Sequence, residues 1–175
     1  MLKRVLLVTP GRYYEPEGEL FLDGIEDVRW LGEQINRRGL KPQIVFFTNE
    51  RYSMYSALIL TGVVKSVNNI GLPLESHAHE KIRSPGRVAF WKNFREMLRA
   101  ESNARAYFRK SFLISDRVEE VIVISEPGFG GVFPNTDEKK VFSHTYWVHP
   151  IVWTLDIQTQ ILSLSCNPGE RFGSI

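Results

Sequence analysis

Apolar residues fall into short continuous runs and into stretches with helical spacing. The runs at residues 4–9, 44–47 and 121–125 are typical of strands buried on both faces of a parallel sheet. After each of the first two runs, apolar residues recur along one side of a helix: Ile25, Val28, Leu31 and Ile35, then Tyr55, Leu58, Ile59, Val63 and Val67. The pattern over residues 4–67 therefore predicts the order strand–helix–strand–helix, in which the strands belong to a parallel sheet.

Polar residues and glycines predict where these helices begin and end. Asp23 is followed three residues later by a glutamate, which is the spacing of a capping box, so we expect Asp23 to cap the first helix. Arg37 and Arg38 favour the negative end of that helix, and Gly39 suits the left-handed residue that follows it. Asn49 is the expected cap of the second helix.

In the rest of the chain, the sequence pattern predicts a long irregular segment, a helical region and a terminal hairpin. Residues 68–86 contain glycines and prolines without periodicity, whereas 91–108 carry an apolar stripe with helical spacing. A glycine-rich turn follows the strand at 121–125, and residues 151–167 predict two strands around a polar turn at 156–160. There is no repeat or interdomain linker, so residues 1–175 predict a single domain.

Composition narrows the class of protein. The chain has 175 residues, of which 43% are hydrophobic and 24% charged, as in globular proteins. No apolar run approaches the roughly 18–20 residues that cross a bilayer, and the run at 5–8 is too short for a secretory signal, so we expect a cytoplasmic protein with no membrane partner. Cys166 is the only cysteine, which excludes an intrachain disulfide and a thiolate metal site.

Positive charge is concentrated in one segment. The net charge is +2, but residues 81–117 contain ten Lys/Arg and three acidic residues, a local net charge of +7. Such a segment could bind nucleic acid or an acidic protein. Its arginines lie mostly off the apolar stripe, which is typical of a solvated helix face, so nucleic-acid binding is the less favoured interpretation.

Several segments follow one another in an informative order. They are Thr9-Pro10-Gly11 after the first strand, Leu-Phe-Leu-Asp-Gly at 20–24, Phe-Thr-Asn-Glu-Arg-Tyr-Ser-Met-Tyr-Ser-Ala at 47–57, Val-Ile-Val-Ile-Ser-Glu-Pro-Gly at 121–128 and the hairpin at 151–166. Their order and spacing resemble the histidine phosphatase (phosphoglycerate mutase-like) superfamily along nearly the whole chain. The resemblance implies a three-layer α/β/α sandwich with a mainly parallel central sheet.

The resemblance also implies that both catalytic histidines are replaced. The family's first histidine attacks phosphorus, but its position here is Pro10, whose amide nitrogen has no lone pair to offer. The arginine before it is Thr9, and the family's helix arginine aligns with Tyr52, although the adjacent Arg51 could partly replace it. The second histidine aligns with Glu126. A carboxylate about 4 Å from a phosphate charge would cost about 4 kcal/mol at an effective dielectric constant near 20.

A pocket is still expected at the strand ends, where open α/β sheets bind ligands. We hypothesise that Glu126 pairs with Arg12 or Arg51 across it. The family's proton donor is often a glutamate in the long loop, here Glu75 or Glu80. The candidate pocket residues are Thr9, Gly11, Arg12, Asn49, Arg51, Tyr52, Glu80, Glu126 and Gly128.

Two further motifs carry weaker signals. His77 and His79, with the glutamate that follows, could bind zinc, but loop histidines at this spacing are more often surface residues, so no metal is expected. The glycines at 128–131 fit neither the dinucleotide-binding nor the Walker spacing. No cofactor is therefore expected.

Three functions are compatible with the sequence. The leading interpretation is a non-catalytic histidine phosphatase-like domain, a pseudophosphatase, that binds a small ligand or a protein or has a structural role, as a monomer or homodimer. The first alternative is a divergent phosphatase or other hydrolase with Ser53, Ser125 or Glu126 as nucleophile. The second is a basic adaptor for nucleic acid or an acidic protein.

Overall fold

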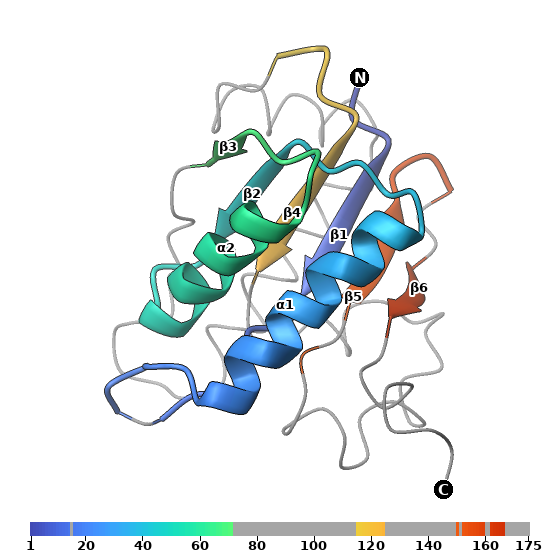
Figure 1. The fold of residues 1–175 in the computed structure, drawn as a ribbon. Helices are drawn as coiled ribbons and strands as arrows, with labels where there is room; N and C mark the ends of the chain where they lie inside the picture. The colour runs from blue at the N-terminus through green and yellow to red at the C-terminus, as the bar shows by residue number, and fades with distance from the viewer. Residues whose placement is uncertain (15, 72–114, 125–149, 151, 160–161, 167–175) are drawn as a thin grey trace, which may run out of the picture.

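The computed structural model (Figure 1) describes residues 1–14, 16–71, 115–124, 150, 152–159 and 162–166. Its elements are, in chain order, β1 (Arg4–Val8), α1 (Leu22–Arg37), β2 (Ile44–Phe47), α2 (Arg51–Val63), β3 (Asn69–Ile70), β4 (Glu120–Ile124), β5 (Val152–Asp156) and β6 (Leu162–Cys166). The predicted order of strands and helices over residues 4–67 and the predicted terminal hairpin are both confirmed. The predicted helical region at 91–108 and the glycine-rich turn lie outside the described residues.

The strands form one six-stranded sheet in the order β3-β2-β4-β1-β5-β6. β1 and β2 both run parallel to β4, whereas β5 runs antiparallel to β1 and to β6. The sheet is therefore mainly parallel, as expected. Val8 and Phe47 are both paired in register with Ile124, so β1, β2 and β4 end at the same edge.

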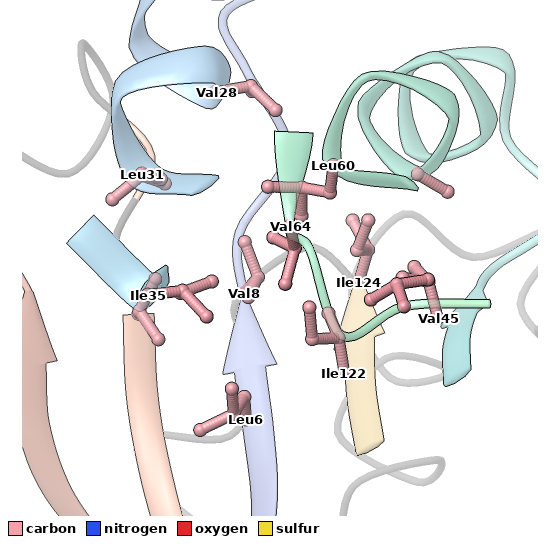
Figure 2. Close-up of a cluster of buried hydrophobic side chains, with 13 residues drawn as sticks. Leu6, Val8, Val28, Leu31, Ile35, Val45, Leu60, Val64, Ile122 and Ile124 are labelled. Carbon is pink, nitrogen blue, oxygen red and sulfur yellow. The ribbon is translucent and has the colours of Figure 1, made fainter. Parts of the chain in front are cut away.

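Both described helices cover one face of this sheet (Figure 1). Side chains from α1, α2 and four strands meet there in one apolar cluster, which Figure 2 shows. In β1, Leu6 and Val8 belong to this cluster, while Val5 and Leu7 alternate to the opposite face and are equally buried. The continuous apolar run therefore reflects a strand covered on both faces, which is the arrangement predicted from sequence.

The predicted helix caps are wrong. The residue before α1 is Phe21, with extended backbone, and its N–H donates to the Arg12 carbonyl at 2.9 Å. Asp23 lies inside the first turn, where its carboxylate accepts the Gly24 N–H at 2.9 Å. Glu50 rather than Asn49 precedes α2, and no side chain caps either helix.

The predicted C-terminal end of the first helix is confirmed, whereas that of the second helix is wrong. α1 ends as expected, with Arg37 in its last turn and Gly39 in the left-handed region at a φ of 69°. α2 stops at Val63 rather than continuing through Val67. Val67 is nevertheless buried in the core cluster, which accounts for the apolar residue that extended the helical pattern. Among the described residues, no helix has the length and apolarity that crossing a bilayer requires.

The turn between β5 and β6 is organised by the Asp156 carboxylate. Thr159 donates its backbone N–H at 2.7 Å and its hydroxyl at 2.9 Å to Asp156 Oδ1. These hydrogen bonds, the backbone one above all, hold the pKa of the Asp156 carboxyl below its ordinary value. The ionised form of the Asp156 carboxyl thus stabilises the hairpin.

Replacing Asp156 with alanine is expected to lower the free energy of unfolding by about 1 kcal/mol at neutral pH. Because the carboxyl pKa is lower in the folded chain, this contribution is complete above the ordinary value of about 3.9 and is lost as the pH falls through the folded value. Urea unfolding of both proteins at neutral and acidic pH measures the difference, which should shrink on acidification. A difference independent of pH would contradict the role of the charge.

Candidate functional site

The candidate site lies at the edge where β1 and β2 end. Thr9 follows β1 and Thr48 follows β2, and both side chains are buried. The N–H of Thr48 donates to the Ile124 carbonyl at 3.2 Å, which ties the end of β2 to the end of β4. This edge of an open α/β sheet is where ligands usually bind. The structure thus brings together the strand ends that the sequence placed in the pocket.

The segment after β1 is held between the two helices. Gly11 is buried, and its N–H donates to Ser56 Oγ of α2 at 3.1 Å. The Ser56 hydroxyl in turn donates to the Tyr52 carbonyl at 2.8 Å. On the other side, a Cβ on Gly11 would lie only 2.6 Å from the carbonyl oxygen of Gly24 in α1. The backbone at Gly11 therefore contacts both helices directly, and the preceding Pro10 is half-buried.

Tyr52 is covered by an aromatic partner that the sequence did not predict. Its side chain is buried, and its ring stacks on Tyr13 with centroids 3.9 Å apart and planes 16° from parallel. Gly18, with a φ of 71°, closely approaches the start of α2. A Cβ added to Gly18 would lie 3.1 Å from the Cβ of Arg51. The loop between β1 and α1 therefore lies on the first turn of α2.

Three polar candidates in this part of the chain, Arg12, Asn49 and Arg51, are exposed, unlike Thr9. Arg12 Nη1 lies 3.2 Å from Asp23 Oδ2, and the Arg12 guanidinium lies 4.7 Å from the centroid of the Phe21 ring. Because both charged side chains are about half exposed, this ion pair contributes little stability but does orient the arginine. Asn49 and Arg51 are exposed. The hypothesised partner of Arg12 and Arg51, Glu126, lies outside the described residues, and the partner that the structure gives Arg12 is Asp23.

One alternative nucleophile is poorly placed for catalysis. Ser53 is completely buried, and its Oγ accepts a hydrogen bond from the Thr48 hydroxyl at 2.9 Å. A nucleophile must reach a substrate, so this geometry argues against Ser53 in a hydrolase. The other two alternatives, Ser125 and Glu126, lie outside the described residues.

The remaining sequence candidates also fall outside the part of the chain that the structure describes. They are Glu80 and Gly128 of the pocket, Glu75, and the histidine pair His77 and His79. Within the described ranges, no three His, Cys, Asp or Glu side chains come close enough to hold a metal ion. In the described part of the chain, the carboxyls with a clearly lowered pKa are Glu119 and Asp156, which lie near the opposite end of β1, beside Lys3 and Arg4.

Comparison with known proteins identifies the fold. No protein-family model matches the chain, and no curated protein is significantly similar to it. Among solved structures, the chain is similar to a protein assigned as the phosphohistidine phosphatase SixA from Agrobacterium tumefaciens, with a TM-score of 0.57 and 8% identity over 94% of this chain and 96% of that one.

Two further solved structures agree with that comparison. One is the protein histidine phosphatase SixA complexed with tungstate, with a TM-score of 0.53 and 13% identity over 93% of this chain and 97% of that one. The other is a phosphoglycerate mutase from Bacillus anthracis, with a TM-score of 0.53 and 9% identity over 93% and 91% of the two chains. The chain has the α/β fold of the histidine phosphatase and phosphoglycerate mutase-like proteins.

Proposed function

We propose that this chain is a non-catalytic histidine phosphatase-fold domain, a pseudophosphatase with a binding or structural role. The position that would carry the nucleophilic histidine is Pro10, which immediately follows the buried strand end at Thr9. A proline nitrogen in a peptide bond cannot attack phosphorus. The neighbouring arginine position is also lost, because Thr9 is neutral and its side chain is buried.

The stack of Tyr13 on Tyr52 is the observation that carries the proposal. Tyr52 aligns with the family's phosphate-binding arginine, and its ring is buried under Tyr13 at 3.9 Å. Two apolar ring faces in contact cannot offer the charged donors that a phosphoryl group requires. Close by, the Gly11 N–H, a potential oxyanion donor, is already donated to Ser56 Oγ. Both features favour a closed, internally bonded strand edge over an open phosphate cradle.

Hydrolysis of p-nitrophenyl phosphate tests the absence of catalysis. We expect turnover no greater than the rate in buffer from pH 4 to 9, with and without divalent metal ions, alongside a histidine phosphatase that retains both histidines as the active control. Pro10→His is expected to remain inactive, because Thr9 and Tyr52 still lack the positive charge that binds the phosphoryl group and the carboxylate of Glu126 repels it. Robust turnover that disappears in Glu126→Ala would instead establish the divergent hydrolase.

Tungstate binding gives a second readout that does not depend on turnover. The similar SixA structure is a complex with tungstate, an oxyanion of phosphate-like shape. We expect tungstate to leave the thermal unfolding midpoint of this chain unchanged, since a ligand of the native state would raise it by mass action. A saturable increase that is lost in Arg51→Ala would show that the site still binds oxyanions and would contradict the closed edge proposed here.

A further inference from the structure

An exposed apolar platform lies at the start of α1. It consists of Tyr14, Phe21 and Leu22. The Leu22 side chain is 74% exposed, more than any other large apolar side chain among the described residues, and Tyr14 is 50% exposed. Phe21, which stacks on Tyr14 and immediately precedes Leu22 in the sequence, is half-buried. A single exposed apolar residue is ordinary, but a contiguous group of this kind marks interaction sites.

The platform is held in place by contacts within the chain. The Tyr14 ring stacks on Phe21 with centroids 3.5 Å apart, and the Arg12 guanidinium lies 4.7 Å from the same Phe21 ring. The backbone of Tyr14 is fixed as well, because it accepts the Gly18 N–H and donates to the Glu19 carbonyl, both at 2.8 Å. Aromatic side chains that are already ordered lose little conformational entropy when they bind.

The fold itself does not require a leucine at this position. α1 packs on the sheet through Val28, Leu31 and Ile35, and Leu22 is not in that cluster. The side of α1 that is exposed is otherwise charged, at Glu26 one turn later and at Arg29. An apolar side chain that contributes little to the core thus directly follows Phe21, one of the two ordered aromatic residues.

The charges around the platform indicate what it binds. Arg12 and Asp23 pair with each other. Among the described residues of this loop and the first two turns of α1, the other exposed acidic side chains are Glu17, Glu19 and Glu26. Glu19 faces Tyr14 across the loop, and Glu26 is one helical turn from Leu22. An apolar contact area with an acidic rim is complementary to an apolar side chain flanked by positive charges.

We propose that the platform docks a peptide segment of a partner protein in which Lys or Arg residues flank an aliphatic side chain. This proposal rests on the binding role proposed above and names the class of partner. The acidic rim repels polyanions, which excludes nucleic acid and anionic membranes from this face. A second copy of the chain, joined symmetrically through the same face, would place Glu17, Glu19 and Glu26 against themselves, which is unfavourable.

Fluorescence anisotropy with a labelled Lys-Leu-Lys-Lys-Leu-Lys peptide tests the proposal on the full chain. Saturable binding is expected, and it should be absent with the matching Glu-Leu-Glu-Glu-Leu-Glu peptide. Leu22→Ser should weaken binding about ten- to a hundredfold, the scale expected for burying one leucine. The matched control is Leu58→Ser on α2, where an equally apolar side chain is 50% exposed, and it should leave binding unchanged.

A second pair of substitutions isolates the acidic rim. In Glu17→Gln combined with Glu19→Gln, binding should be weaker at low salt and should depend less on salt concentration than in the wild type, because two charges are removed. Both residues are exposed, so the variant should fold normally.

Three results would overturn the proposal. They are the absence of saturable binding of the basic peptide, equal losses in Leu22→Ser and Leu58→Ser, and a reversible dimer in sedimentation that Leu22→Ser abolishes, which would assign the face to a second copy. Peptide binding and phosphate ester hydrolysis are read separately, so a failure of this proposal is distinguishable from a failure of the non-catalytic assignment.

Discussion

Truncating Leu60 to alanine is expected to lower the free energy of unfolding by about 2–5 kcal/mol. Leu60 is completely buried on the inner side of α2 and belongs to the cluster that joins both helices to the sheet (Figure 2). Its removal loses the transfer free energy of the side chain and leaves a cavity that close-packed neighbours fill only partly. Urea unfolding monitored by circular dichroism measures the change.

Leu58→Ala is the matched control for this experiment. The same substitution is made two residues away in the same helix, at a side chain that is 50% exposed. Its effect should stay within about 0.5 kcal/mol, as is usual for surface substitutions. Similar losses at Leu58 and Leu60 would show that the face of α2 assigned to the core is wrong.

Replacing Gly24 with alanine is expected to destabilise the chain by about 1–3 kcal/mol, the usual cost of overpacking. The new methyl group would lie 2.4 Å from the Arg12 carbonyl oxygen and 2.8 Å from the Arg12 nitrogen. These are backbone atoms, so relief requires the whole segment after β1 to move away from α1. The same measurement, chemical unfolding, gives the magnitude.

Gly62→Ala separates this clash from the helix propensity of alanine. Gly62 lies in α2 with open space around the position of a Cβ, so alanine there should stabilise the chain by up to about 1 kcal/mol. Opposite signs at Gly24 and Gly62 are the expected outcome. Stabilisation at both positions would mean that Arg12 does not approach α1 as closely as the structure places it.

The sequence predicted the elements better than their boundaries. Continuous apolar runs identified β1, β2 and β4 because burial on both faces of the sheet favours apolar residues at successive positions, after the charged first residues Arg4 and Glu120. The cap at Asp23 was mispredicted because a capping box is a local pattern, whereas the start of α1 is set by the Arg12 carbonyl, which accepts the Phe21 N–H. The competing contact is part of the loop geometry and leaves no periodic signal.

The candidate site could be predicted only in part for a similar reason. Thr9, Gly11 and Tyr52 were identified through the resemblance, and the structure places all three near the ends of β1 and β2. The contacts that close this edge were missed. Tyr13 lies 39 positions before its partner Tyr52, and Gly11 lies 45 positions before its partner Ser56. Only the folded arrangement of α2 against the loop brings such residues together.

The strand order also determines when during synthesis the sheet can form. β1 and β2 are neighbours in sequence, but β4 lies between them, and Val5 of β1 pairs with Val121 and Leu155, 116 and 150 residues later. At about 5–20 residues per second, the ribosome needs on the order of ten seconds after making β1 to make its first partner. Until then this largely apolar strand of the nascent chain has two open edges. Such a chain is expected to depend on chaperones for its yield, even though the same strand ends at the centre of the finished sheet.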